Sequence, residues 1–168
     1  MDPQKKKILL VEDEDFIREL YVRQLTKAGF QIKSAADGQT GLQMLKSESF
    51  DLLLLDIMLP GMNGLQLLRE YKTQNPNSPM ITILLTNLGQ EAVIKEGFEL
   101  GAQAYLIKAS YTPDQVVNEV KNTLLGQGTS LVTPPGTSTP PTAPQNPPVP
   151  PVPPTTPQTP PMPPTNPV

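Results

Sequence analysis

Five short apolar segments alternate with segments of helical periodicity along residues 7–125, and this alternation constrains the fold more than any other feature. Two of the apolar segments contain LLLL and ITILL, which do not alternate polar and apolar residues as a half-exposed strand does. Strands buried on both faces are typical of parallel sheets covered by helices. We therefore expect an α/β fold, a doubly wound five-stranded parallel sheet with helices on both faces. The expected strands are 7–11, 31–35, 51–55, 80–85 and 104–107.

Capping and turn residues predict the helix boundaries. Thr112 as N-cap, Pro113 in the first turn and Gln115 closing a capping box mark the start of the last helix. The other helices are expected from Phe16 to Gly29, after an Asp37-Gly38 turn, from near Asn63 to Tyr71, and from about Ala92 to Gly101. The apolar face of the first helix is expected to consist of Phe16, Ile17, Leu20, Leu25 and Ala28.

Composition excludes several classes of function. The chain has no Cys and no His, so it lacks thiolate and imidazole metal ligands and the imidazole base of a hydrolytic triad. Its 13 Lys and Arg against 16 Asp and Glu form no basic stripe, so direct DNA binding is not expected. No apolar run is long enough to span a membrane, and the N-terminus lacks a signal-like stretch. We expect a soluble, cytoplasmic protein without membrane contact.

The chain changes character near residue 128. Of its 22 Pro, 17 lie between Pro134 and Pro167, and no charged residue follows Lys121. Such a segment cannot offset an ordering cost of roughly 1 to 2 kcal/mol per residue by burying apolar surface. We therefore expect one domain over residues 1–127 and a disordered, Pro/Thr-rich tail with polyproline II bias over residues 128–168. The tail has three interpretations: an inert spacer, a polyproline ligand for an aromatic groove, or a glycosylated stalk.

Polar residues follow four of the predicted strands, where ligands of doubly wound sheets bind. They are Glu12 and Asp13, Asp56, Thr86, and Lys108. If the first and third strands are neighbours, three carboxylates converge, and each like-charge pair about 5 Å apart costs on the order of 3 kcal/mol. A cation should balance them. Oxygen ligands alone suit Mg²⁺ better than a transition metal.

Four motifs resemble the receiver domain of two-component response regulators. They are the acidic pair in LLVEDED, the stretch LLLLDIMLPGMNG, the strand end ILLT, and GAQAYLIKAS with its Lys. They occur in the family's order and spacing, and the resemblance covers about residues 6–126. It implies a flavodoxin-like sheet with strand order 2-1-3-4-5.

The resemblance also implies roles for the residues at the strand ends. Asp56 would accept a phosphoryl group from a phosphohistidine. Asp13 directly, Glu12 through water, Asp56 and the carbonyl of Met58 would hold Mg²⁺. Lys108 would pair with Asp56 and then with the phosphoryl oxygens, as phosphoryl transfer requires charge neutralisation.

Two further residues would form a switch, and two depart from the family's pattern. Thr86 would turn toward the phosphoryl group, and Tyr105 would change rotamer with it, so that phosphorylation shifts a pre-existing equilibrium. Ala109 stands where the family usually has Pro, and Asn87 stands where it usually has a small residue. These departures put the dephosphorylation rate and the choice of partner in question.

The acidic run after the first predicted strand divides between two interpretations. Acidic side chains in a first helical turn stabilise the helix by about 0.3 to 1 kcal/mol each, and we expect this role for Glu14 and Asp15. For Asp13, the resemblance favours the metal.

The resulting hypothesis is a single-domain receiver, a phosphoacceptor rather than an enzyme, that assists its own phosphotransfer and autodephosphorylation. Its expected partners are a sensor histidine kinase or histidine phosphotransfer protein and a downstream protein, with a phosphorylation-dependent dimer left open. One alternative is a non-phosphorylated pseudo-receiver that acts as a protein-binding module, which Ala109 and Asn87 favour. A small hydrolase is a third alternative, although no P-loop or nucleophile elbow is present.

Overall fold

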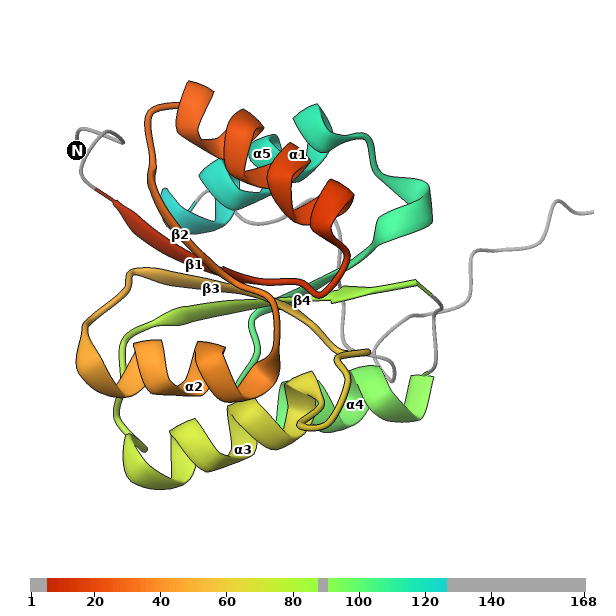
Figure 1. Ribbon diagram of the computed structural model, residues 1–168. Helices are drawn as coiled ribbons and strands as arrows, with labels where there is room; N and C mark the ends of the chain where they lie inside the picture. The colour runs from red at the N-terminus through yellow and green to blue at the C-terminus, as the bar shows by residue number, and fades with distance from the viewer. Residues whose placement is uncertain (1–5, 88–90, 127–168) are drawn as a thin grey trace, which may run out of the picture. The chain divides into compact units, whose positions relative to one another are not determined.

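The computed structural model describes residues 6–87 and 91–126, which form a parallel sheet of five strands (Figure 1). The strand order is β2-β1-β3-β4-β5, as expected for a flavodoxin-like fold. All four neighbouring pairs are parallel. The strands are β1 Lys7–Val11, β2 Gln31–Ala35, β3 Leu52–Asp56, β4 Ile81–Thr86 and β5 Ala104–Ile107. The expected fold class and strand order are thereby confirmed.

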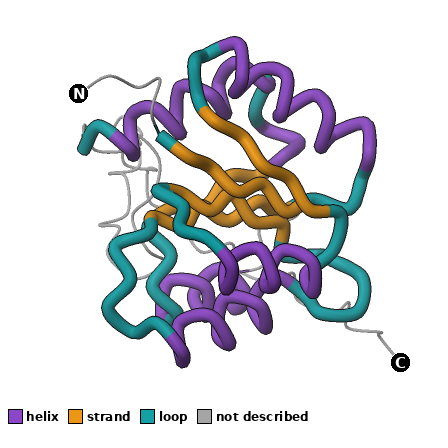
Figure 2. Tube along the Cα trace, turned by 60° about the vertical axis from the view of Figure 1, so that its left-hand side comes forward, coloured by secondary structure: helices purple, strands orange, loops and turns teal. Residues whose placement is uncertain are grey.

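In the described part of the chain, five helices cover the two faces of the sheet. They are α1 Asp15–Lys27, α2 Gly38–Ser47, α3 Gly64–Gln74, α4 Glu91–Glu99 and α5 Pro113–Leu124, and a short 3₁₀ turn, η2 Lys108–Ser110, follows β5. Helices α1 and α5 lie on one face, and α2, α3 and α4 lie on the other (Figure 1). In the turned view the strands run between these two layers (Figure 2). The predicted capping box of α5, with Thr112 and Gln115, is present.

Each central strand contributes to two separate apolar cores, and this explains the uninterrupted LLLL run. Leu53 and Leu55 pack in the core shared with α2 and α3, whereas Leu52 and Leu54 pack in the core shared with α1 and α5. All four are fully buried. Because side chains of a strand alternate between faces, a strand buried on both faces must be apolar at every position.

Two strand ends differ from expectation by one residue. Asp56 pairs with Leu85 and Thr86 pairs with Ile107, so both polar residues are the last residues of their strands rather than the first residues of loops. Strand pairing is a property of the backbone, which a polar side chain does not interrupt. The residues of chemical interest are therefore held within the sheet.

Two predictions about the helices were wrong. Asp37 and Gly38 do not form a turn before α2: Asp37 is its N-cap, accepting hydrogen bonds from the backbone N–H and hydroxyl of Thr40 at 2.7 and 2.8 Å. An Asp before a helix satisfies an otherwise unpaired N–H, which outweighs its turn preference. Phe16 is 76% exposed, whereas Tyr21, which was not predicted, is buried. At about 100° per residue, Phe16 lies nearly opposite Tyr21 around the axis of α1.

The predicted tail, residues 128–168, and its boundary at residue 127 lie outside the described residues. All described residues belong to one unit, Met1–Thr137. Within that part of the chain, no helix is both long and apolar enough to cross a membrane.

Candidate functional site

The pairing of β1 with β3 brings three carboxylates together at the carboxyl edge of the sheet. Val11 pairs with Leu55, so Glu12 and Asp56 follow at adjacent positions. Glu12 is fully buried and Asp56 is 1% exposed. Carboxylate oxygens of Glu12, Asp13 and Asp56 all lie within 4.8 Å of one another. The convergence expected from the sequence is therefore present.

Lys108, directly after β5, places its ammonium group between two of these carboxylates. Its Nζ donates to both oxygens of Glu12 at 3.0 Å and to Oδ2 of Asp56 at 2.8 Å. The Lys108 side chain is only 7% exposed. Its Nζ also lies 3.9 Å from a carboxylate oxygen of Glu14. Such charge-assisted hydrogen bonds are stronger than neutral ones.

The pKa values at this edge reflect burial and mutual charge. Burial raises the pKa of Glu12 to about 7; the hydrogen bonds from Lys108 oppose this rise, and the charge of Asp56 adds to it. Burial alone would lower the pKa of Lys108, but its hydrogen bonds to Asp56 and Glu12 outweigh burial and raise it. Lys108 therefore carries a positive charge at neutral pH, whereas burial favours the protonated form of Glu12.

The backbone after β3 fixes the position of Asp56. The N–H of Met58 donates to Oδ1 of Asp56 at 2.9 Å, while the Met58 side chain is 63% exposed. A Cβ atom at Gly64 would lie 2.2 Å from the carbonyl oxygen of Asp56, so only Gly allows α3 to begin this close to β3. Asn63 caps α3 in a reciprocal capping box with Gln66.

Thr86 and Tyr105 lie on one face of the sheet. Thr86 ends β4 and is 5% exposed. Tyr105 pairs with Leu84 in the β4–β5 register. Because strand side chains alternate, Leu84, Thr86 and Tyr105 share the face covered by α4. The ring of Tyr105, half-buried, meets that of Phe98 edge-on with centroids 6.1 Å apart.

The two departures from the family's pattern lie at the surface. Asn87 is exposed directly after β4, and Ala109 is exposed within η2. No peptide bond among the described residues is cis. Lys108 nevertheless reaches Asp56, so the 3₁₀ turn at Ala109 leaves that ion pair intact.

The donor set fits a hard divalent cation. One ammonium group faces three carboxylate side chains, so when all three are ionised their negative charge exceeds its positive charge by two. All three side chains offer oxygen, which Mg²⁺ prefers. The residues present therefore suit Mg²⁺, with Asp13 the more accessible ligand beside two buried ones.

Two residues at the site were not recognised from the sequence. Arg18 donates from Nη1 to the backbone carbonyls of Glu12 and Asp13 at 2.8 and 3.3 Å. Its position one turn beyond the acidic run was the signal available. Gly64 lies near the predicted start of a helix, but its close approach to Asp56 depends on tertiary packing that no local motif encodes.

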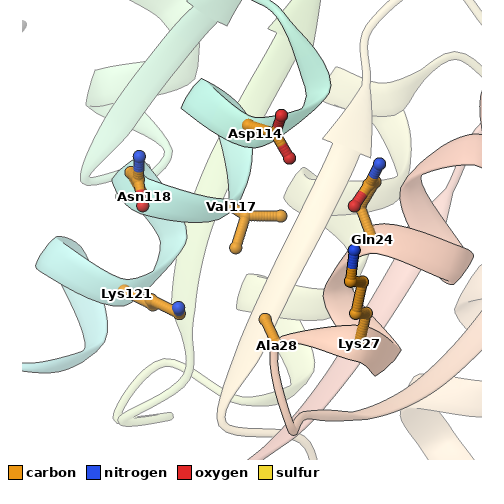
Figure 3. Close-up of a pocket in the computed structure, with 7 residues that line it drawn as sticks. All are labelled: Gln24, Lys27, Ala28, Asp114, Val117, Asn118 and Lys121. Carbon is orange, nitrogen blue, oxygen red and sulfur yellow. The ribbon is translucent and has the colours of Figure 1, made fainter.

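Two surface hollows lie at different distances from the carboxylates. A groove of about 540 Å³ includes Asp13, Met58, Leu59, Pro60 and Val93, between the β3–α3 loop and α4. A smaller one, of about 210 Å³, lies between α1 and α5 and is lined by residues such as Lys27 and Lys121 (Figure 3). It includes none of the three carboxylates, so the candidate site opens toward the first groove.

Comparison with known proteins agrees with this geometry. The chain matches the model of the response regulator receiver domain over residues 8–121. It is 41% identical over 117 residues to the transcriptional regulatory protein SrrA of Staphylococcus aureus, an alignment that covers 68% of this chain and 46% of that protein. The chain therefore spans about half the length of the curated relatives it matches.

Solved structures resemble the chain over the same region. A CheY-like response regulator receiver domain protein from Methanospirillum hungatei JF-1 has 30% identity and a TM-score of 0.67, covering 73% of this chain and 95% of that one. The response regulator TrrA from Thermotoga maritima, solved in complex with Mg²⁺-BeF, has 33% identity and a TM-score of 0.62. That match covers 71% of this chain and 98% of TrrA.

Proposed function

Because the chain belongs to the response regulator receiver domain family, we propose that Asp56 accepts a phosphoryl group in a Mg²⁺-dependent phosphorelay. The donor is the phosphohistidine of a sensor histidine kinase or of a histidine phosphotransfer protein. The observation that carries this proposal is the bridge from Lys108 to both Asp56 and Glu12, within a cluster of three carboxylates. A structural ion pair would not require a third carboxylate.

The transfer exchanges one bond to phosphorus for another. An Asp56 oxygen bonds to phosphorus as the bond from phosphorus to the donor imidazole nitrogen breaks, and that nitrogen keeps the electron pair. Lys108, 2.8 Å from Asp56 Oδ2, is close enough to follow the charge onto a phosphoryl oxygen. The Met58 N–H holds Oδ1 at 2.9 Å and so orients the carboxylate. The same groups would assist later loss of the phosphoryl group to water.

The metal site is assigned to the same edge. Asp13 directly, Glu12 through water, Asp56, and the Met58 carbonyl would hold Mg²⁺. Bound Mg²⁺ supplies neutralisation of the phosphoryl oxygens, which is the main requirement of this chemistry. The three carboxylates whose oxygens lie within 4.8 Å of one another, two of them on buried residues, support this assignment.

Two exposed apolar side chains support docking of a protein donor over the site. Phe16 is 76% exposed in the first turn of α1, and Met58 is 63% exposed two residues after Asp56. Asp56 itself is 1% exposed, so a donor imidazole must sit directly above this edge. Aromatic and Met side chains are enriched where proteins associate.

The proposed output is a conformational switch. Thr86 turns toward the phosphoryl group and Tyr105 changes rotamer with it, which alters the surface formed by α4, β5 and α5. The position of both side chains on one face of the sheet supports this coupling.

The downstream partner is proposed to be a protein, without direct DNA binding by residues 1–127. We keep the assignment of residues 1–127 to the domain and of residues 128–168, which follow in the sequence, to a Pro/Thr-rich tail. We assign the whole to the cytoplasm, where ATP-dependent kinases form phosphohistidine.

Intact-mass spectrometry tests the proposal. The chain is incubated with acetyl phosphate and Mg²⁺, beside Asp56→Asn, Asp114→Asn as a matched exposed control in α5, and a sample with EDTA. We expect one labile phosphoryl adduct on the wild type and Asp114→Asn, and none on Asp56→Asn or with EDTA. An adduct that persists on Asp56→Asn would refute the assignment. No adduct on any sample would favour the second candidate, the non-phosphorylated pseudo-receiver. Asn87 and Ala109, the two exposed departures from the family's pattern, favour that candidate.

A further inference from the structure

Arg18 links helix α1 to the loop that carries two of the three carboxylates. Its Nη1 donates to the carbonyl of Glu12 at 2.8 Å and to that of Asp13 at 3.3 Å. Its Nη2 forms an ion pair with Asp15. The side chain is 18% exposed. One guanidinium group thus holds two consecutive peptide units of the loop.

The other contacts of this loop involve the N–H groups of Glu12 and Glu14, whereas Arg18 binds the carbonyls of Glu12 and Asp13. The N–H of Glu12 donates to the Ala35 carbonyl at 3.1 Å, which continues the pairing of β1 with β2. The N–H of Glu14 approaches Oε1 of Glu12 at 3.4 Å. The Glu14 N–H belongs to the peptide that follows Asp13, and Arg18 binds the carbonyl of that same peptide, so the two contacts hold it from both sides.

We propose that Arg18 is a positioning residue for Mg²⁺ binding, because it fixes the backbone from which Glu12 and Asp13 extend. This inference rests on the proposed function. Groups that orient metal ligands without touching the metal commonly change metal affinity by about 10- to 100-fold when removed. Without Arg18, the ordering of the loop would have to accompany each binding event, and Mg²⁺ affinity would fall.

The direction in which Mg²⁺ affinity changes when Arg18 is replaced distinguishes a positioning role from a purely electrostatic one. Arg18 is a cation near a cation site, so removing its charge alone would strengthen Mg²⁺ binding. Positioning predicts the opposite result. Lysine at this position would keep the charge but lose the planar fork that reaches two carbonyls and Asp15 together.

The test measures Mg²⁺ affinity of the full chain by isothermal titration calorimetry. The samples are wild type, Arg18→Ala, Arg18→Lys and the control Arg23→Ala, which removes the same charge from an exposed position of α1. We expect about tenfold weaker binding for Arg18→Ala, several-fold weaker binding for Arg18→Lys, and unchanged or slightly tighter binding for Arg23→Ala. Circular dichroism melts define a temperature at which every variant is folded.

A second readout separates positioning from catalysis. The Mg²⁺ concentration that gives half-maximal phosphorylation by acetyl phosphate should rise for Arg18→Ala by the same factor as the dissociation constant. The rate at saturating Mg²⁺ should change much less. A merely structural role would shift the melting temperature without moving either Mg²⁺ value.

Three results would overturn the inference: wild-type affinity in Arg18→Ala, wild-type affinity in Arg18→Lys, or equal weakening in Arg23→Ala. If Arg18→Ala does not fold, Arg18→Lys decides alone. Failure of the wild type itself to bind Mg²⁺ would instead refute the proposed function, so the two failures are distinguishable.

Discussion

The ammonium nitrogen of Lys108 lies 3.0 Å from both carboxylate oxygens of Glu12, two residues separated by 96 positions in the chain. The same nitrogen contacts Asp56 at 2.8 Å. One buried cation thus holds together the ends of β1, β3 and β5.

Lys108→Met should destabilise the metal-free protein by about 3 kcal/mol, because removing one partner of a buried ion pair leaves the other uncompensated. Saturating Mg²⁺ should restore part of this loss, since it supplies positive charge to the same carboxylates. Urea unfolding with and without Mg²⁺ measures both effects. Lys46→Met, which removes a surface pair with Glu70, should cost at most about 1 kcal/mol and show no response to Mg²⁺. Equal losses in the two variants would contradict the prediction.

Gly64→Ala should lower both stability and phosphorylation. Its Cβ would lie 2.2 Å from the Asp56 carbonyl oxygen, so α3 or the acceptor strand must move, at a cost of about 1 to 3 kcal/mol. Gly61→Ala is the control: Gly61 has φ of 72° but open space around it, so Ala there meets only backbone strain of about 1 to 2 kcal/mol. Chemical unfolding and acetyl phosphate labelling should show impaired labelling in Gly64→Ala alone. Normal labelling of Gly64→Ala would show that the contact is irrelevant to the acceptor.

Asp51 should contribute stability that disappears in acid. Burial opposes its charge, but hydrogen bonds from Lys6 Nζ at 2.7 Å and the Lys7 N–H at 2.9 Å outweigh burial and lower the pKa of Asp51. A lowered folded-state pKa means that the contribution is present above the unfolded pKa of about 3.9 and is lost as pH falls through the folded value.

Asp51→Asn tests this pH dependence. The variant should be less stable than the wild type at pH 6, by about 1 kcal/mol for a partly exposed hydrogen-bonded group. The difference should shrink steadily as pH falls below 4. Urea midpoints at a series of pH values measure it, and a difference independent of pH would contradict the sign of the shift.

Phe16→Ala should leave stability within about 0.5 kcal/mol of wild type, because the side chain is 76% exposed. Transfer from a phosphorylated histidine phosphotransfer domain should slow roughly tenfold, as expected for loss of an aromatic anchor. Labelling by acetyl phosphate, which needs no protein docking, should be unchanged. Equal slowing with both donors would place the effect in the chemistry rather than in docking.

The sequence predicted the parts of this molecule that depend on local pattern. Uninterrupted apolar runs predicted the strands, and Thr112 with Gln115 predicted the start of α5, because burial on two faces and capping act through nearby residues. Exposure of Phe16 was not predicted, since the rotation of α1 depends on how it packs against α5 and the sheet.

The candidate site was predictable to a similar degree. Its acidic residues and Lys108 follow the strands in the order of the receiver-domain motifs, so the resemblance identified them. The hydrogen bonds of Arg18 and the close approach of Gly64 to Asp56 were not predictable, because they depend on backbone geometry between elements. Strand pairing also extended one residue beyond the predicted ends of β3 and β4.

Asp56 and Thr86 are the final residues of paired strands, whereas Asn87 and Ala109 are exposed in the segments that follow. Reactive groups held by a backbone ladder keep their places when neighbouring segments change in length or composition. If Asp56 accepts a phosphoryl group as proposed, natural variation at exposed positions such as Asn87 and Ala109 would alter which proteins dock, or how long that group survives, without changing the position of Asp56. This separation between reactive residues held in the sheet and variable residues at the surface would let duplicated genes acquire separate pathways while sharing one chemistry.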